Sequence, residues 1–243
     1  MTAYANETVG RIAAQNPASV RVFEKLGIDY CCGGKLPLRE SCEQAKIPLE
    51  EVVALLEEIE NRPADGDRDW SQAAAAELVE HIVGKHHAFV RSEIPRLRKL
   101  LVKVNERHGA SHSELAEIQE LFEAAAEELQ AHLLKEERVL FPHIEALETA
   151  ARLQRPAPQG CFPSVEFPIA RMLADHDDAG GLFASIRNLS SQYAPPEDAC
   201  ESYRALYHGL RGFEQDLHRH IHLENNILFP RAIELERGVS AGS

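Results

Sequence analysis

The sequence contains no apolar segment that approaches the roughly 20 residues needed to cross a bilayer. Its N-terminus, MTAYANETVGRIAAQNP, lacks the basic segment followed by an apolar segment that marks a secretory signal. The five cysteines form no even-numbered framework, and this odd count fits a reducing compartment better than an export route. These absences predict a cytoplasmic protein without a membrane partner.

Basic residues are also scarce relative to acidic ones. The chain has 26 Lys and Arg residues against 39 Asp and Glu residues, which gives a formal net charge of −13. An acidic surface repels phosphate groups, so neither nucleic acid nor a polybasic membrane contact is expected. Strand signals are weak, because no clear alternating apolar pattern and no hairpin dipeptide between apolar runs occur.

What the sequence does contain is a helical pattern in two parts. Hydrophobic residues make up 44% and charged residues 27%, a balance that favours a packed globular core. The polar, breaker-rich stretch 61–67 predicts a linker, so we expect a small helical domain over residues 1–66 and a larger one over 67–243. The short helices expected in the first domain cover residues 8–15, 17–26, 38–46 and 48–60, with Pro17 in a first turn and Gly27 just past an end.

The larger domain shows much longer helical segments. We expect helices over residues 73–104, 114–149, 165–192 and 197–236. Mostly short connections between four long helices predict an antiparallel four-helix bundle, and hence an all-α protein. Pro95 lies inside the first of these helices and should kink it.

Two segments of the bundle repeat each other. HLLKEERVLFP at 132–142 matches HIHLENNILFP at 220–230, with His, Glu, Leu, Phe and Pro in register. Each copy has one candidate histidine upstream, at nearly equal separations: His87 before the first copy and His176 before the second. The repeat therefore describes a duplicated helical hairpin.

The spacing within the repeat suits metal binding. Positions i and i+4 of a helix project together, so His132 and Glu136 can present an imidazole and a carboxylate to one point. His220 and Glu224 can do the same from another helix. Imidazole and carboxylate suit iron or manganese, and carboxylates can bridge two metals. A single His-x-x-x-Glu is more often a solvated ion pair, but two copies in register, each with an upstream histidine, favour ligation by His87, His132, Glu136, His176, His220 and Glu224.

A helix rotates by about 100° per residue, and this rotation places most other histidines away from the ligand face. We expect His81, His86, His218 and His222 at the surface or in supporting positions. His143 returns to the ligand face about three turns away and could be a further partner. His108 and His112 lie in or near a loop and receive no role.

The adjacent Cys31 and Cys32 are followed by two glycines, which allow close approach by another group. As thiolates they could bind iron, accept a nitrosyl group or exchange with a disulfide, and Lys35 could lower a thiol pKa if it came close. Alternatively they are small buried side chains in a turn. Cys42, Cys161 and Cys200 stand alone, and no chemistry is expected of them.

These metal-ligand motifs, together with the segment DYCCGGK at 29–35, resemble the family of di-iron proteins for the repair of iron centres, over nearly the whole chain. The resemblance implies two iron ions per chain, oxo- and carboxylate-bridged, held by the six ligands named above with both glutamates bridging. It implies a cytosolic stress-response factor that helps restore iron–sulfur clusters damaged by nitric oxide or hydrogen peroxide by supplying iron. Cys31 and Cys32 would then act in transfer, with damaged iron–sulfur proteins as partners.

Other interpretations stay open at this point. The di-iron pair could bind or sense nitric oxide or oxygen, or it could reduce nitric oxide, so the sequence does not decide whether the protein is an enzyme. The bundle could also be structural with an incidental metal. An interface through the small domain would give a homodimer.

Overall fold

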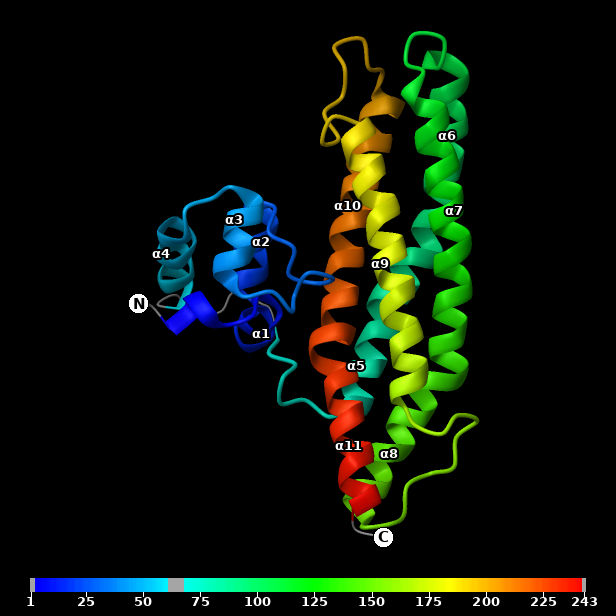
Figure 1. The fold of residues 1–243 in the computed structure, drawn as a ribbon. Helices are drawn as coiled ribbons and strands as arrows, with labels where there is room; N and C mark the ends of the chain where they lie inside the picture. Colours follow the sequence, from blue (N-terminus) through cyan, green and yellow to red (C-terminus); the bar gives the residue numbers. More distant parts are fainter. Residues whose placement is uncertain (1–2, 61–67, 242–243) are drawn as a thin grey trace. The chain divides into compact units, whose positions relative to one another are not determined.

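The computed structural model describes residues 3–60 and 68–241 of the chain. Within these ranges every element is helical, and the β-type pairing found there is an isolated bridge between Thr8 and Pro37. The all-α prediction is therefore confirmed (Figure 1). The predicted linker 61–67 lies outside the described residues. No helix in the described ranges is both long and apolar enough to cross a membrane.

Two compact units divide the chain, and each combines segments that are distant in sequence. The first consists of Met1–Val79, Ile144–Gln159 and His218–Ser243, and the second of Glu80–His143 and Gly160–Leu217. The domain boundary between residues 66 and 67 stays a prediction.

The first unit begins with short helices around an apolar core. They are the 3-10 turn η1 (Ala3–Asn6), α1 (Val9–Gln15), α2 (Ser19–Leu26), α3 (Leu38–Ala45) and α4 (Leu49–Glu60). α2 ends at Gly27, which adopts a left-handed φ of 67° that glycine tolerates without strain. Pro17 lies before α2 and not in its first turn as expected. Phe23, Leu38 and Leu56 are fully buried and bring three of the helices together.

The later segments of the first unit are α5 (Ala75–His81) up to Val79, α8 (Phe141–Leu153) from Ile144, the end of α10 (Glu201–Leu223), and α11 (Phe229–Ala241). The start of α5 is held by Glu148 of α8, whose carboxylate accepts the N–H groups of Ala75 at 2.6 Å and Ala76 at 3.1 Å. A carboxylate at this position satisfies otherwise unpaired backbone donors.

The second unit is an antiparallel bundle of α6 (Ala88–His108), α7 (Glu114–Lys135), α9 (Glu166–Leu189) and the part of α10 up to Leu217 (Figure 1). Contacts along the helices give their directions. On α7 and α9, Phe122 meets Phe183 while His132 meets His176, so the two helices run in opposite directions. The predicted antiparallel four-helix arrangement is thus confirmed in this unit.

An aromatic cluster forms the centre of the second unit. The rings of Phe183 and Phe213 stack with their centroids 5.1 Å apart, and Phe122 meets both edge-on. All three are essentially inaccessible to solvent. Burying phenylalanine contributes about 1.5–3 kcal/mol per side chain relative to leaving it exposed, so this cluster is a main source of the bundle's stability.

The long helices are interrupted by π-helical turns, which the sequence analysis did not predict. They are η2 (Ile82–His87), η3 (Glu136–Leu140) and η4 (Glu224–Leu228). The second and third lie directly before Phe-Pro pairs at Pro142 and Pro230. Proline lacks an N–H and its ring clashes with the carbonyl four residues back, which favours a wider turn just before it. α6 continues through Pro95 without interruption of its helical assignment.

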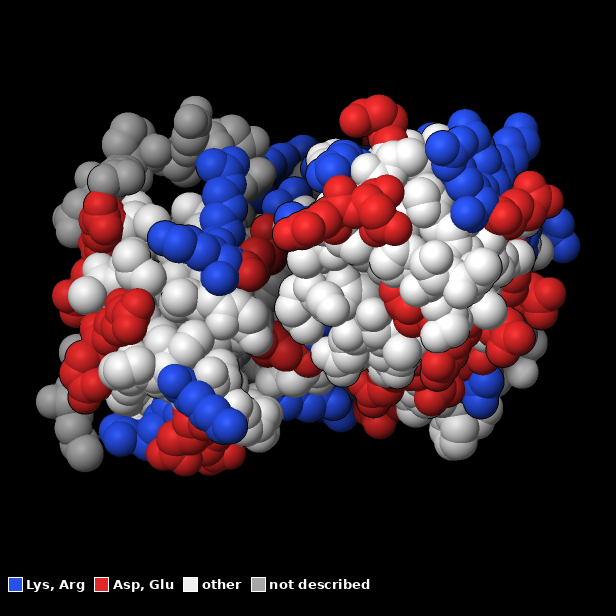
Figure 2. Space-filling model, turned by 90° about the horizontal axis from the view of Figure 1, so that it is seen from above, with Lys and Arg blue, Asp and Glu red and all other residues white. Residues whose placement is uncertain are grey.

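Charged side chains of both signs are interspersed on the face seen in Figure 2. The second unit contains ion pairs near its surface, such as Arg98 with Glu123, whose charged atoms are 2.7 Å apart. Pairs of this kind are worth little individually in water. The fold is therefore held by its apolar cores and helix contacts more than by its surface charges.

Candidate metal centre

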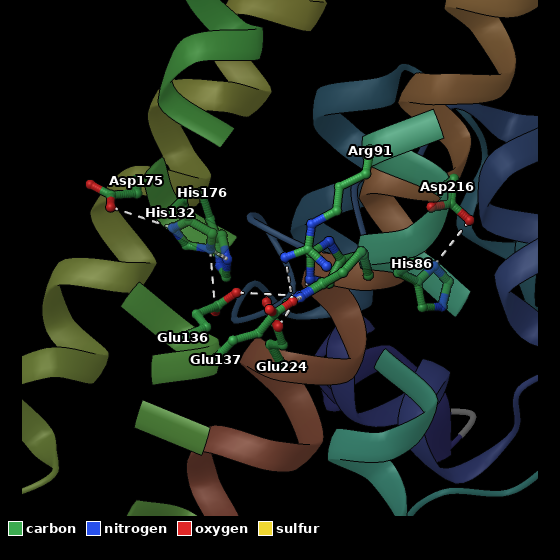
Figure 3. Close-up of polar contacts among 11 residues, drawn as sticks. His86, Arg91, His132, Glu136, Glu137, Asp175, His176, Asp216 and Glu224 are labelled. Carbon is green, nitrogen blue, oxygen red and sulfur yellow. Dashed lines mark hydrogen bonds and ion pairs between the residues drawn. The ribbon is translucent and has the colours of Figure 1, made fainter. Parts of the chain in front are cut away.

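Four of the six predicted ligands lie in the second unit, and Figure 3 shows His132, Glu136 and His176 among them close together. The Nε2 atoms of His132 and His176 are 3.0 Å apart, and His132 Nε2 is 3.2 Å from Glu136 Oε1. The other carboxylate oxygen, Glu136 Oε2, lies 3.5 Å from His87 Nε2. The potential ligand atoms of His132, Glu136 and His176 all lie within 4.8 Å of one another. Three imidazoles from three elements therefore surround one carboxylate.

Burial makes this arrangement unusual. Glu136 and His87 are 0% exposed, and His132 and His176 are at most 2% exposed. A carboxylate removed from water is costly unless it is paired or coordinates a metal. The imidazole nitrogens and the carboxylate are the donor types that iron, manganese and zinc accept. The residues present therefore fit a metal ion.

Two imidazoles are oriented by carboxylates on their far side. His87 Nδ1 lies 2.6 Å from Glu137 Oε1, which also accepts a hydrogen bond from Arg91. His132 Nδ1 lies 3.4 Å from Asp175 Oδ2. When the proton of a neutral imidazole sits on Nδ1 and is donated to a carboxylate, Nε2 is left free to bind a metal. A carboxylate behind the ring is usual around metal-binding histidines. These contacts favour the tautomer of His87 and His132 in which Nε2, the nitrogen that faces Glu136, can bind a metal.

The supporting carboxylates are held in their charged form. Burial alone would raise the pKa of Glu137, but hydrogen bonds from His87 and Arg91 outweigh it and lower the pKa below its usual range. At Asp175 burial likewise acts to raise the pKa, whereas Lys135 and His132 lower it overall. Charged acceptors at Nδ1 increase the basicity of the opposite nitrogen.

The remaining two predicted ligands lie in the first unit. His220 Nε2 is 3.0 Å from Glu224 Oε1, and both side chains are at most 1% exposed. Glu224 is the first residue of η4, as Glu136 is the first residue of η3. The second copy of the repeat thus reproduces the local geometry of the first. That the two sets meet in one site stays a prediction.

Two of the other histidines, His86 and His222, are buried. His86 is 1% exposed, and its Nδ1 lies 3.0 Å from Asp216 Oδ1. His222 is also buried, and its Nδ1 lies 3.0 Å from the side-chain nitrogen of Asn226. Of the two positions expected for these histidines, at the surface or in support of the ligands, only a supporting position fits His86 and His222, because both are buried. The ring of His143 packs edge-on against Phe162.

A small pocket of about 150 Å³ opens beside His132. Its lining includes the carboxylates of Glu128, Asp175 and Asp178, together with Lys135 and Arg171. A volume of this size holds a few molecules as small as water. The pocket thus gives a small molecule or ion access to one predicted ligand.

The cysteine pair lies in a tight loop of the first unit. Asp29 organises the loop, because its carboxylate accepts the N–H groups of Cys31 at 3.0 Å and Gly33 at 2.9 Å. The Sγ atoms of Cys31 and Cys32 are 3.9 Å apart, so the pair is present as free thiols. The contact with Cys32, burial and the charge of Asp29 raise the pKa of Cys31 well above its usual value. Any lowering by Lys35, as the sequence suggested, does not prevail at Cys31.

Asn226 fixes the cysteine loop to the π turn η4. Its side-chain nitrogen donates to the carbonyl of Tyr30 at 3.1 Å. A Cβ added to Gly34 would lie 2.9 Å from Asn226 Oδ1 and 2.7 Å from the Tyr30 carbonyl, so only glycine allows this approach. Nearby, Arg219 makes a bidentate pair with Glu24 at 2.8 Å. The loop that carries the thiols is therefore bound to the turn that begins with Glu224.

Replacing Asn226 by alanine should loosen this loop. Loss of one hydrogen bond of about 1 kcal/mol corresponds to roughly fivefold more of the open form. We expect Cys31 to react about fivefold faster with a thiol reagent, measured by mass spectrometry of the labelled peptide. Asn188→Ala, which makes the same change on α9, is the control. Equal labelling of Cys31 in both variants would contradict the role given to Asn226.

Comparison with known proteins assigns both parts of the chain. Residues 79–232 match the family described as hemerythrin HHE cation binding domain, and residues 5–60 match ScdA_N, a domain of unknown function (DUF542). Relatives align over nearly the full chain. The Iron-sulfur cluster repair protein YtfE of Pectobacterium atrosepticum is 35% identical over 96% of this chain and 100% of its own. The Probable iron-sulfur cluster repair protein of Haemophilus influenzae is 34% identical over 95% and 98%, and YtfE of Escherichia coli O157:H7 is 33% identical over 95% and 98%.

Sequence reasoning missed the residues that support the ligands. Glu137 and Asp175 each stand next to a predicted ligand in the sequence, and this adjacency was the available signal. Asn226 falls inside the second repeat at a position where the first repeat has Arg138, and it could not have been found by comparing the copies. Its partner is a backbone carbonyl of a distant loop, which no sequence pattern reveals.

Proposed function

The chain belongs to the family of iron–sulfur cluster repair proteins with a hemerythrin domain, and from this premise we propose that it holds releasable iron and supplies it to damaged iron–sulfur proteins. The observation that carries the proposal is the buried cluster in which the imidazoles of His132 and His176 meet the carboxylate of Glu136. Such a donor set suits iron. We further propose a cytoplasmic location, where free cysteine thiols persist.

Six residues would hold two iron ions in this proposal: His87, His132, Glu136, His176, His220 and Glu224. The match of one hemerythrin domain to residues 79–232 supports grouping the two sets, because all six fall within it. Glu136 faces two imidazoles through different oxygens, which suits a bridging carboxylate. Glu224 would take the equivalent role, since it has the same position in the repeat and the same burial.

Iron is the cargo in this function. Carboxylates bind the ferrous ion less tightly than the ferric ion because the electrostatic attraction grows with charge, so a reductant should favour release. Glu137 and Asp175 keep the imidazoles oriented for rebinding. The pocket beside His132, with three carboxylates in its lining, offers a route for a cation.

Cys31 and Cys32 would receive or pass on the iron. Thiolates are good iron ligands, but a thiol must first lose its proton. The raised pKa of Cys31 keeps this thiol protonated while the loop is held as observed. We therefore propose that contact with a client protein, by changing the surroundings of Cys31, makes the pair competent to bind iron.

A second candidate function is binding or reduction of nitric oxide, or binding of oxygen. The pocket of about 150 Å³ beside His132 would admit a diatomic molecule. This function needs access to the metals but does not need Cys31 and Cys32. Formation of nitrous oxide by a variant lacking both cysteines would favour it.

The test is iron transfer from the full-length protein. Protein loaded with iron is mixed under a reductant with an iron–sulfur protein stripped of its cluster, with sulfide supplied. We expect the acceptor to regain its cluster absorption and activity. An acceptor that regains neither, while the same acceptor is restored by free ferrous iron, would contradict the supply of iron by this protein.

A further inference from the structure

A second cluster of metal-binding side chains lies in the second unit, far from the candidate metal centre. It is formed by His108 at the end of α6, His112 in the following loop, and Asp198 and Cys200 just before α10. His108 is about 30 Å along the helix axis from His87. The two sets therefore share no residue and are separated by most of the length of α6.

The four side chains offer their ligand atoms to one another. His112 Nε2 lies 3.0 Å and 3.1 Å from the two carboxylate oxygens of Asp198. His108 Nε2 lies 3.2 Å from Cys200 Sγ. Potential ligand atoms of His108, His112 and Asp198 all lie within 4.8 Å of one another. Two imidazoles and one carboxylate thus gather at one point, and the thiol of Cys200 adjoins this group through His108.

His112 is oriented in the manner of a metal ligand. Its Nδ1 lies 3.3 Å from Glu114 Oε1, on the side of the ring opposite to Asp198. A carboxylate at Nδ1 fixes the ring and leaves Nε2 to coordinate. The ring also meets Tyr203 edge-on at 5.5 Å, and His108 packs on the same tyrosine at 5.3 Å. Contacts with Tyr203 therefore position both imidazoles, and Glu114 additionally orients His112.

Cys200 is placed where a thiolate is favoured. It directly precedes Glu201, the first residue of α10. The backbone N–H of Tyr203 lowers the pKa of the Cys200 thiol below its usual value, although the slight burial opposes this. A thiolate at a helix N-terminus is both a better nucleophile and a better metal ligand than an ordinary thiol.

We propose that His108, His112, Asp198 and Cys200 form a second cation site, which takes a zinc-class divalent ion. Four ligands of the types N, N, O and S match the tetrahedral sites that zinc prefers. The thiolate selects against magnesium and calcium, which take oxygen ligands. The bound ion would join the end of α6 and its following loop to the start of α10. This inference does not depend on iron supply.

The test uses the full-length protein with its iron in place, so that the candidate metal centre is filled. Cobalt(II) is added as a coloured substitute for zinc. We expect one additional cobalt per chain and a near-ultraviolet thiolate-to-cobalt band that zinc then bleaches. Cys200→Ser should abolish the band, whereas Cys161→Ser, a change at another single cysteine, should leave it intact. Iron content should be equal in all three proteins.

Two further measurements secure the assignment. Glu114→Gln removes only the group behind His112 and should weaken cobalt binding about 10- to 100-fold while preserving the band. Zinc should raise the melting temperature of the iron-loaded wild type and of Cys161→Ser, but not of Cys200→Ser. Absence of the band in the wild type would overturn the proposal. A band that survives in Cys200→Ser but is lost when Cys31 and Cys32 are both replaced would overturn it too.

Discussion

Replacement of Glu136 by alanine is expected to remove most of the bound iron, the largest effect of any single change in the bundle. Glu136 faces His87 Nε2 with one oxygen and His132 Nε2 with the other. If it bridges two ions, its loss removes a ligand from both at once. The iron content of the purified variant, measured by elemental analysis, should therefore fall from two per chain to well below one.

Glu137→Gln is the matched control, because it alters the neighbouring carboxylate and leaves the proposed ligand set complete. The hydrogen bond that His87 donates to Glu137 would be weakened, and losses of this kind typically cost 10- to 100-fold in metal affinity. The purified Glu137→Gln protein should retain iron but release it faster to a chelator. Equal iron content in wild type and Glu136→Ala would show that Glu136 is not a ligand.

Replacing both Cys31 and Cys32 by alanine should abolish repair without removing iron. The pair lies in the loop that Asn226 binds, and neither cysteine belongs to the predicted ligand set. We expect an iron content equal to wild type and a transfer rate to the stripped acceptor that falls to the rate of passive iron loss. Recovery of cluster absorption in the acceptor provides the measurement.

Cys161→Ser is the control for this experiment, since Cys161 is an exposed cysteine outside both the loop and the second cation cluster. It should transfer iron at the wild-type rate. A double variant that repairs as well as wild type would assign the cysteines to packing alone. That result would favour the second candidate function, the binding or reduction of a small molecule at the metals.

Much of the fold followed from sequence periodicity. The four long helical segments, their antiparallel order and the all-α class were predicted because an apolar repeat near 3.6 residues persists over them. The His-x-x-x-Glu repeat likewise predicted that His132 would lie beside Glu136 and His220 beside Glu224, as observed. The resemblance to proteins for the repair of iron centres is confirmed by relatives aligned over nearly the whole chain.

Features that depend on contacts between distant segments could not be predicted. The π turns at Glu136 and Glu224 arise from the balance between a proline downstream and packing around the ligands, whereas propensity alone favours an unbroken α-helix. The sequence predicted no role for His108 and His112, because their partners Cys200 and Asp198 are about 90 residues away in the sequence. The spacing of residues within one segment does not indicate that His108 and His112 contact Asp198 and Cys200 in the fold.

The most direct measurement of the central claim is the metal content of the full-length protein as purified, together with its Mössbauer spectrum. We expect two iron ions per chain that are magnetically coupled through shared ligands, and loss of that coupled signal in Glu136→Ala. Iron present as isolated, uncoupled ions, or a spectrum unchanged in the variant, would contradict a di-iron centre held by the repeated His and Glu residues.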